Sequence, residues 1–548
     1  MAELTGGQAL VQSLKREGVD TIFALPGAQL DWAFDALHEE QDTIRVIHTR
    51  HEQATSYMAD GYARATGKVG TCLVVPGPGV LNAGAGLSTA YACSSPVLCL
   101  AGQINSKLIG SGRGELHEIK DQRAVLDTVT KWTGRALSPS AIPDLMREAF
   151  AQLRGGRPAP VGLEIPPDVL MRRQEVDLGA AADWGQRPTL QSADPALIKQ
   201  AATLLARAER PAFYVGSGVL QAEAWDELRE IAEALEIPVV MSRNGRGALS
   251  ARHPLALNPV AGLELLANCD LVVAVGTRFL EPSMGWGLPE GQQYIQIDVA
   301  PDEVGRNVTP TVGIVADAKL ALTALRDELD GVKRKGASRL AEIKAIRERA
   351  DDTLFELQPQ AAFAGAIRSA LPDDGVFICD VNQISYWSWV GFPVYEPRTF
   401  ITSGYQGTLG AGYATALGAQ VGQPERKVVS INGDGGFGYN LQELATAKAH
   451  NIATVAIVFD DGAFGNVKRM QRDQFDGRTI ASNLTNPDWL KLADAFGIAG
   501  MRATTPDELE GALREAFASN GPALISVPVG EMPSPWPLIY PKMFGKRR

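Results

Sequence analysis

Several features are scarce in this chain of 548 residues, and each scarcity excludes a class of protein. The 5 cysteines are odd in number and show no CxxC spacing, which argues against a disulfide scaffold and is typical of reduced core thiols in a cytoplasmic protein. The first residues contain no basic segment followed by an apolar one, so we expect no signal peptide. The uncharged interval 69–106 is cut by Pro and Gly into short pieces, so we expect no membrane span.

Positive charge is also in short supply. The 52 Lys and Arg residues against 63 Asp and Glu leave a net charge of −11, which argues against nucleic acid or an anionic membrane as the main partner. Any phosphate that the protein binds must therefore be held locally. With 45% hydrophobic and 21% charged residues, the chain has the composition of an ordinary globular protein, and its length demands several hydrophobic cores.

Short β-rich apolar runs alternate with helical patterns along almost the whole chain. This rhythm predicts βαβ units and therefore an α/β fold made of doubly wound parallel sheets. We expect three such domains, at 1–175, 190–335 and 360–530. The charged, helix-prone stretch 327–352 is expected to link the second domain to the third. A tail at 531–548, rich in Pro and aromatic residues, is expected to lie over a surface or a site.

The most informative segment is 427–470. One strand is expected to end in Gly433-Asp434-Gly435-Gly436, and after a helix a second strand is expected to end in Asp460-Asp461-Gly462. Glycines at the carboxyl end of a strand let backbone N–H groups approach an anion, and a carboxylate in such a turn suits Mg²⁺. Because the two strand ends should lie side by side, we expect Asp434 and Asp461 to meet at one ion.

The spacing of these two turns carries a resemblance. The 24 residues between Gly435 and Asp460 resemble the thiamine diphosphate motif, in which GDG is followed at about that distance by NN. With the other matching stretches, the chain resembles nearly throughout the family of acetolactate synthase, benzaldehyde lyase and pyruvate decarboxylase, and the first two most. That family has a pyrimidine-binding, a central Rossmann-like and a diphosphate-binding domain, in this order. The other matching stretches are Leu25-Pro26-Gly27, His51-Glu52, Ala59-Asp60-Gly61-Tyr62-Ala63-Arg64, Gly77-Pro78-Gly79 and 404–412.

The resemblance implies a set of ligands for thiamine diphosphate and Mg²⁺. Asp434, Asp461 and the carbonyl of Ala463 would bind the metal. The family usually has Asn in place of Asp461, and the extra charge should tighten the metal while slightly repelling the diphosphate. The implied cofactor contacts besides Glu52 and Leu409 are Gly27, Asn82, Asn382, Gln383, Gly407, Gly435, Gly436 and Asn466.

Glu52 matches the glutamate that activates the cofactor by bonding its pyrimidine ring, and we expect it to be poorly hydrated. Leu409 matches the apolar wedge that bends the cofactor, and the carbonyl of Gly407 would accept from its amino group. The alternatives are a solvent-exposed helix glutamate and an ordinary core leucine. In the family the two segments face each other across a subunit interface, so the resemblance implies at least a homodimer, commonly a homotetramer.

The residues expected next to the substrate differ from those of pyruvate decarboxylase-like enzymes. Pyruvate decarboxylase-like enzymes carry an aspartate and a glutamate where this chain has Ala28 and Val467. Without these acids, release of an aldehyde is disfavoured, which points to carboligation or C–C cleavage of 2-oxo acids, 2-hydroxyketones or aldehydes. Gln29 follows Gly-Ala much as a polar residue does in benzaldehyde lyase. His117 stands where carboligases usually have glutamine, and is either a proton relay or a loop histidine bonded to backbone.

Two further readings stay open. A non-oxidative 2-oxo acid decarboxylase is the close alternative, and a non-catalytic cofactor-binding scaffold is the alternative from another class. The central domain resembles one that holds FAD in acetolactate synthases and ADP or nothing in other members. Because the flavin-binding segment is replaced by Phe279-Leu280-Glu281-Pro282, FAD is possible but not favoured.

Overall fold

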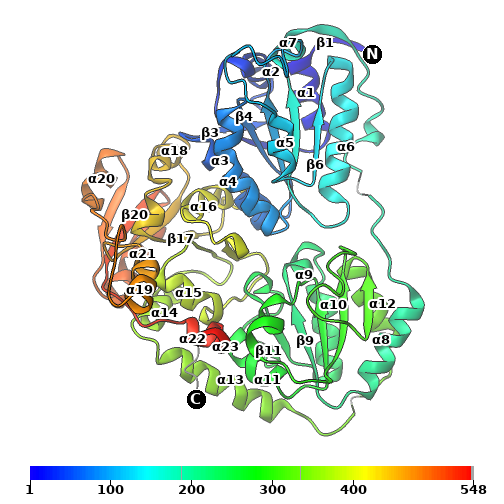
Figure 1. Cartoon of the computed structure of the whole chain (residues 1–548), viewed down its shortest axis with the longest axis vertical. Coiled ribbons are helices and arrows are strands. Elements are labelled where there is room, and N and C mark those ends of the chain that lie inside the picture. The colour runs from blue at the N-terminus through cyan, green and yellow to red at the C-terminus, as the bar shows by residue number, and fades with distance from the viewer. Residues whose placement is uncertain (187, 334, 545–548) are drawn as a thin grey trace.

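The computed structural model describes residues 1–186, 188–333 and 335–544. Three α/β domains follow one another along the chain, each on its own six-stranded parallel sheet (Figure 1). This confirms the predicted α/β fold of three doubly wound parallel sheets. Within those described ranges, no helix is long and apolar enough to cross a membrane.

The first domain has the strand order β3-β2-β4-β5-β7-β6. Its inner strands are buried on both faces, as β5 shows with six buried residues in succession, and this explains their continuous apolar runs. An antiparallel pair, β1 (Ala2–Thr5) and β8 (Arg173–Val176), joins the two ends of the domain. The strands are β2 (Thr21–Ala24), β3 (Arg45–His48), β4 (Gly70–Val74), β5 (Val97–Gly102), β6 (Trp132–Arg135) and β7 (Val161–Ile165). The helices are α1 (Gly6–Arg16), α2 (Asp31–Glu39), α6 (Ile142–Arg154) and α7 (Pro167–Met171) on one face, and α3 (Glu52–Thr66), α4 (Pro78–Ala92) and α5 (Gln122–Asp127) on the other.

The central domain has the order β11-β10-β9-β12-β13-β14, which is the 3-2-1-4-5-6 order of dinucleotide-binding folds. Helix α13 (Leu340–Phe355) lies in the charged stretch expected to link domains, yet Ile343 and Ile346 belong to the central core and Leu354 to the third. The strands are β9 (Pro211–Val215), β10 (Val239–Met241), β11 (Ala256–Leu257), β12 (Leu271–Val275), β13 (Gln293–Asp298) and β14 (Val312–Val315). The other helices are α8 (Pro195–Arg207), α9 (Ser217–Gln221), α10 (Trp225–Leu235), α11 (Pro259–Leu266) and α12 (Ala318–Glu328).

The third domain has the order β16-β15-β17-β18-β20-β19, which in chain order is the same topology as that of the first domain. The strands are β15 (Val376–Cys379), β16 (Phe400–Thr402), β17 (Val428–Gly433), β18 (Thr454–Asp460), β19 (Ala499–Arg502) and β20 (Ala523–Pro528). The helices are α14 (Gln360–Ala370), α15 (Gln383–Gly391), α16 (Ala411–Gly422), α17 (Asp434–Phe437), α18 (Leu444–Ala449), α19 (Gly465–Gln474), α20 (Trp489–Ala495) and α21 (Pro506–Ser519).

The first and third domains meet where α3 packs against α16 (Figure 1). A Cβ on Gly61 would lie 1.9 Å from the carbonyl oxygen of Thr415, and one on Gly418 would lie 1.9 Å from that of Met58. Only glycine allows backbones to approach this closely. One hydrophobic core therefore continues from the first domain into the third.

The tail forms two short helices, α22 (Trp536–Ile539) and α23 (Pro541–Phe544). They lie between the central and third domains, drawn in red in Figure 1. Just before them, the backbone N–H of Met532 donates to Oε1 of Gln383 at 3.0 Å. The tail thus reaches the edge of the third sheet where the strands end.

Candidate active site

Two acidic turns meet at the carboxyl edge of the third sheet. The register of β17 and β18 pairs Gly433 with Phe459, so the turn that begins at Asp434 lies beside the turn that begins at Asp460. Asn486 joins them, since its Nδ2 donates to Oδ2 of Asp434 at 2.6 Å and to Oδ1 of Asp460 at 2.7 Å. The parallel pairing of these strands accounts for the meeting of segments that are distant in sequence.

The electrostatics of this edge favour a cation. Burial raises the pKa of Asp434 to about 6, and the neighbouring carboxylates of Asp461 and Asp460 raise it further against the bond from Asn486. Burial also raises the pKa of Asp461, while a bond from the backbone N–H of Ala463 lowers it. Desolvated carboxylates that repel one another are stabilised by a bound divalent ion, and hard oxygen ligands of this kind suit Mg²⁺.

The expected diphosphate contacts Asn382 and Gln383 lie beside the acidic turns. Nε2 of Gln383 donates to Oδ2 of Asp461 at 2.8 Å, and its Oε1 accepts from Met532 and Arg469. Asn382 caps α15, accepting from the N–H of Ser385 at 2.9 Å and donating to the carbonyl of Ile431 at 3.1 Å. Both side-chain amides are engaged within the chain.

The glycines of the first turn are required by close packing. A Cβ on Gly435 would lie 2.6 Å from the ring of Phe464, and one on Gly436 would lie 2.9 Å from Oδ2 of Asp380. Asn466, in the first turn of α19, accepts a hydrogen bond from Nε1 of Trp536 at 2.9 Å. The tail is therefore bonded to one expected diphosphate contact through Trp536 and to another through Met532.

Glu52 opens helix α3 in the first domain. Helix N-termini favour negative charge, and the preceding cap residue His51 accepts from the N–H of Gln53 at 3.1 Å. Glu52 is half-buried, and its Oε2 accepts from Nδ2 of Asn82 at 3.0 Å. The structure thus brings these two expected cofactor contacts together. Within the described residues, no hydrogen bond joins this pair to the acidic turns of the third domain.

Gln29 and His117 form a second pair in the first domain. Nδ1 of His117 lies 2.9 Å from Oε1 of Gln29, and Nε2 of Gln29 donates to the carbonyl of Leu116 at 3.0 Å. Ala28 is exposed in the same short turn, and Gly27 precedes it at a place where a Cβ would lie 2.3 Å from Val75. His117 adopts a left-handed backbone conformation, with φ of 68°.

The Gly-rich loop of the third domain contains Gly407 and Leu409. Gly407 has φ of 58°, which favours glycine, and Leu409 is half-buried. Thr408 lies between them, and its hydroxyl is 3.1 Å from that of Thr89 on α4. This loop therefore lies against the first domain of the same chain.

Comparisons with known proteins identify the domains. Residues 4–125 match the N-terminal TPP binding domain of thiamine pyrophosphate enzymes, 198–325 match the central domain, and 380–527 match the C-terminal TPP binding domain. The chain belongs to the thiamine pyrophosphate enzyme family. The order of the three domains agrees with the resemblance that the motifs carry.

Relatives place this thiamine pyrophosphate enzyme in the acetolactate synthase-like group, whose members form or cleave C–C bonds. It is 36% identical over 549 residues to a probable acetolactate synthase large subunit of Methanocaldococcus jannaschii, covering 96% of this chain and 92% of the relative. It is 32% identical over 553 residues to the large subunit of acetolactate synthase isozyme 2 of Escherichia coli, covering 98% of both. It is also 35% identical over 532 residues to a probable 2-ketoarginine decarboxylase of Pseudomonas aeruginosa, covering 96% of this chain and 94% of the relative.

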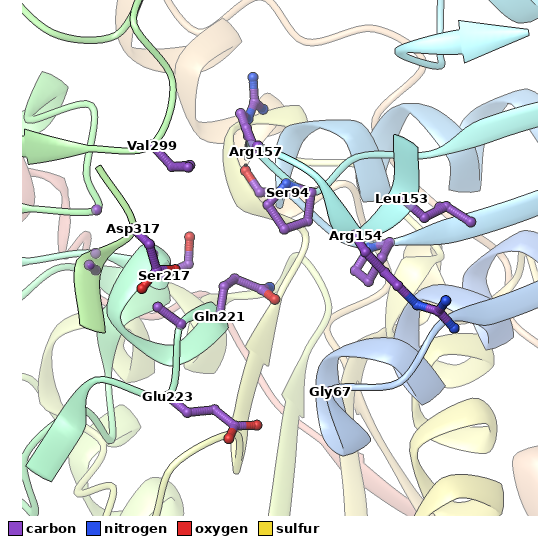
Figure 2. Close-up of a pocket in the computed structure, with 18 of the residues that line it drawn as sticks. Gly67, Ser94, Leu153, Arg154, Arg157, Ser217, Gln221, Glu223, Val299 and Asp317 are labelled. Carbon is purple, nitrogen blue, oxygen red and sulfur yellow. Dashed lines mark hydrogen bonds between the residues drawn. The ribbon is translucent and has the colours of Figure 1, made fainter. Parts of the chain in front are cut away.

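A cavity of about 890 Å³ lies between the first and central domains of this thiamine pyrophosphate enzyme. Figure 2 shows Arg154 and Arg157 on one side, facing Ser217 and Asp317 on the other. Neither Glu52 nor the acidic turns line it, so it is separate from the expected cofactor site.

The segment that replaces the flavin-binding one borders this cavity. Phe279 is only 1% exposed and packs edge-on against Tyr214, with ring centroids 5.0 Å apart, while Glu281 pairs with Arg243 at 3.4 Å. The N–H of Gly218, in the first turn after β9, donates to the carbonyl of Gly276 at 3.0 Å. This segment and this amide are thus occupied by contacts within the chain, and the expectation on FAD stays a prediction.

Three residues that sequence reasoning missed complete the third-domain edge of the enzyme. Asn486 joins the acidic turns, while Asp380 and Asn440 hold the loop of Leu409 through its neighbour Gly410. Asp380 could have been identified from the sequence, because like Asp434 it directly follows a buried strand. Asn440 and Asn486 could not, since asparagines in loops are common.

Proposed function

We propose that this enzyme binds thiamine diphosphate through Mg²⁺ and acts as a carboligase or C–C lyase on 2-oxo acids, 2-hydroxyketones or aldehydes. The observation that carries the proposal is the apolar side chains at two positions where decarboxylases have acids. Ala28 is exposed beside Gln29, and Val467 is 50% exposed on the first turn of α19. Neither can donate a proton to a reacting carbon, so a second carbonyl compound has time to react there.

The acidic turns fit the metal and the diphosphate. Asp434, Asp461 and the carbonyl of Ala463 would hold Mg²⁺, which takes carboxylate, carbonyl and phosphate oxygens. Thiamine diphosphate supplies, when bound, the nucleophilic carbon that adds to a carbonyl substrate. The diphosphate would lie against the backbone of Gly435 and Gly436, with Asn382, Gln383 and Asn466 at its edge.

Glu52 would hold the proton at the pyrimidine ring nitrogen. Asn82 occupies its Oε2, which leaves Oε1 to accept from that ring. Gly79 faces Oε1, and even a Cβ there would stand 3.6 Å from it. The N-terminus of α3 favours a negative charge at this position.

The Gln29 and His117 pair has a defined donor order. The carbonyl of Leu116 can only accept, so it receives the amide N–H of Gln29, and the amide oxygen must face His117. That oxygen in turn accepts from Nδ1 of His117, so a neutral ring carries its proton on Nδ1 and a lone pair on Nε2. We propose that Nε2 exchanges a proton with the substrate hydroxyl.

A second candidate is the non-oxidative decarboxylation of a 2-oxo acid. It is favoured by the relative described as a probable 2-ketoarginine decarboxylase, which is 35% identical over 96% of this chain. The two activities differ in their products. Pyruvate gives acetolactate or acetoin under the first proposal and free acetaldehyde under the second.

A panel of donor and acceptor carbonyl compounds with chiral product analysis tests the proposal. We expect C–C bond formation or cleavage that requires Mg²⁺ and thiamine diphosphate and that Glu52→Gln abolishes while the cofactor stays bound. Acetaldehyde as the sole product from pyruvate would favour the second candidate. Wild-type turnover that Glu52→Gln abolishes would exclude a cofactor-binding scaffold, whereas a wild-type chain that binds the cofactor and converts no compound of the panel would leave only that scaffold.

We further propose that the active unit is at least a homodimer, and in the family's pattern a homotetramer. Large apolar side chains stand exposed next to the expected site residues: Leu81 is 53% exposed, Leu116 62% and Tyr439 52%. A partner subunit that brings its own third domain to Glu52 would cover them. Each chain would thus supply half of each site.

A further inference from the structure

Gly410 ends the loop that carries Leu409 and caps helix α16. It has φ of 84°, and a Cβ there would lie 2.4 Å from Cβ of Tyr439. Its backbone is therefore held in a conformation that only glycine can adopt at this place. Because Leu409 is the next residue toward the N-terminus, the orientation of the Gly410 peptide sets the direction in which that side chain points.

Asp380 holds the N–H side of Gly410. It directly follows β15, is 1% exposed, and accepts from the N–H of Gly410 at 3.2 Å through Oδ1 and 3.1 Å through Oδ2. Oδ1 also accepts from the N–H of Val381 at 2.7 Å, and the N–H of Gly412 contributes as well. Within the described ranges, its hydrogen-bond partners are all backbone amides, and none is a cation. Burial raises its pKa to about 7, and the bonds from these amides lower it.

Asn440 holds the next peptide unit, which joins Gly410 to Ala411. It is fully buried, and its Nδ2 donates to the carbonyl of Gly410 at 2.6 Å. Gly410 is thus bonded at its N–H and at its C=O by two side chains from different turns of the diphosphate half. Asp380 also lies close to the diphosphate turn, because a Cβ on Gly436 would lie 2.9 Å from its Oδ2.

We propose that Asp380 and Asn440 are positioning residues that fix the Leu409 loop to the diphosphate turn. They would set where Leu409 and the carbonyl of Gly407 stand relative to a diphosphate held at Gly435 and Gly436. This inference rests on the proposed function, because it assigns the loop to the thiazolium and pyrimidine part of thiamine diphosphate. It goes beyond that function in naming two side chains that touch neither metal nor substrate.

Two ligands distinguish binding that involves the Leu409 loop from binding at the diphosphate turn alone. Thiamine diphosphate with Mg²⁺ uses both, whereas inorganic pyrophosphate with Mg²⁺ uses the turn alone. We expect Asn440→Ala to weaken thiamine diphosphate at least roughly tenfold, as loss of a buried hydrogen bond allows, and to leave pyrophosphate within about twofold of wild type. Binding is measured by titration calorimetry. The near-ultraviolet circular dichroism of the bound cofactor should weaken in the same variant.

Two further variants guard against a general folding defect. Gln420→Ala is the matched control, because Gln420 is buried at the other end of α16 and donates to the carbonyls of Gln423 and Arg426 at 3.0 Å. It should lower the melting temperature as much as Asn440→Ala does and leave both affinities unchanged. Leu409→Ala should reproduce the selective loss, and the double variant with Asn440→Ala should add little to it, because both act through one side chain.

The outcomes separate the two proposals. Equal loss of both ligands in Asn440→Ala, or no loss of either, would overturn the positioning role. A double variant whose losses add fully would overturn it as well. A wild-type chain that binds pyrophosphate but not thiamine diphosphate would refute the proposed function itself, and the positioning role would fall with it.

Discussion

Two buried carboxylates of the third domain are stabilised in different ways. Asp380 is surrounded by backbone N–H groups, which solvate its charge without a cation. Asp434 has Asp460 and Asp461 for neighbours, so its charge is opposed by like charges. Hydrogen bonds alone offset part of the burial cost in the first arrangement, whereas the second would be stabilised by a divalent ion. This contrast is what the proposed roles require, an orienting role for Asp380 and a metal-binding role for Asp434.

At the residue scale, we expect Asp461→Asn to retain activity. The amide oxygen can still accept from the N–H of Ala463, as Oδ1 does now at 3.2 Å, and can still bind the metal. Loss of one negative charge should weaken Mg²⁺ by about tenfold and ease the repulsion of the diphosphate. The measurement is turnover against Mg²⁺ concentration. Asp434→Ala, which removes the ligand altogether, is the inactive comparison, and complete loss of cofactor binding in Asp461→Asn would contradict the role of Asp461.

At the scale of elements, the crossing of α3 and α16 leaves no room for a side chain at its glycines. We expect Gly418→Ala to lower the melting temperature, because a Cβ 1.9 Å from the carbonyl oxygen of Met58 must push the two helices apart at a cost of about 1–3 kcal/mol. Thermal unfolding followed by circular dichroism measures the effect. Because this crossing joins the first and third domains, activity should fall as well.

The control for the crossing is an exposed helical glycine. Gly365 in α14 has no atom within 4 Å of a Cβ built on it, so Gly365→Ala should leave the melting temperature unchanged or raise it, by the higher helix propensity of alanine. Equal destabilisation by the two substitutions would mean that the close approach of α3 and α16 is not what makes Gly418 necessary.

At the scale of the whole molecule, a histidine pair links the first and third domains. Nε2 of His450 lies 3.0 Å from Nδ1 of His48 and accepts from the backbone N–H of His48 at 3.2 Å. Burial lowers the pKa of His450 to about 4, and the nearby His48 and Arg45 lower it further. The neutral ring is therefore the form that the folded chain holds.

The lowered pKa of His450 predicts that the folded chain loses stability as the pH falls. The unfolded chain binds the His450 proton below about pH 6.5 and the folded chain only near pH 4, so stability present above pH 6.5 is lost as the pH falls through that window. We expect about 1 kcal/mol of loss between about pH 7.5 and about pH 5, discounted for partial exposure. In His450→Gln the amide oxygen can accept the same N–H without titrating. The melting temperature of that variant should therefore fall less on acidification, and an identical fall would remove His450 as the cause.

Subunit mixing tests the shared site. Glu52→Gln and Asp434→Ala chains should each be inactive alone. If each site takes Glu52 from one subunit and Asp434 from the other, a mixed dimer contains one intact site, and a statistical mixture should recover about a quarter of wild-type activity. Absence of recovery in mixtures shown by mass to contain mixed dimers would mean that one chain builds its site alone.

Local patterns in the sequence determined the three α/β domains, the parallel sheets and the meeting of the two acidic turns. Apolar runs fix where strands form, and parallel strands carry their following turns to one edge of a sheet, so Asp434 and the turn of Asp461 could be placed together in advance. The relation of Glu52 to Asn82 was likewise within reach, since both were expected cofactor contacts within the first domain.

Only the tertiary structure decided how these residues are held. Gln29 and His117 are 88 residues apart, and nothing in either segment indicates that they share a hydrogen bond. The same is true of Asn440 and Gly410, and of Asn382, whose side chain is used by its own helix. A buried polar group takes whichever partner the packing of distant segments presents, because leaving it unpaired is costly. Sequence pattern therefore predicted which chemistry is present, and packing determined which side chains orient it.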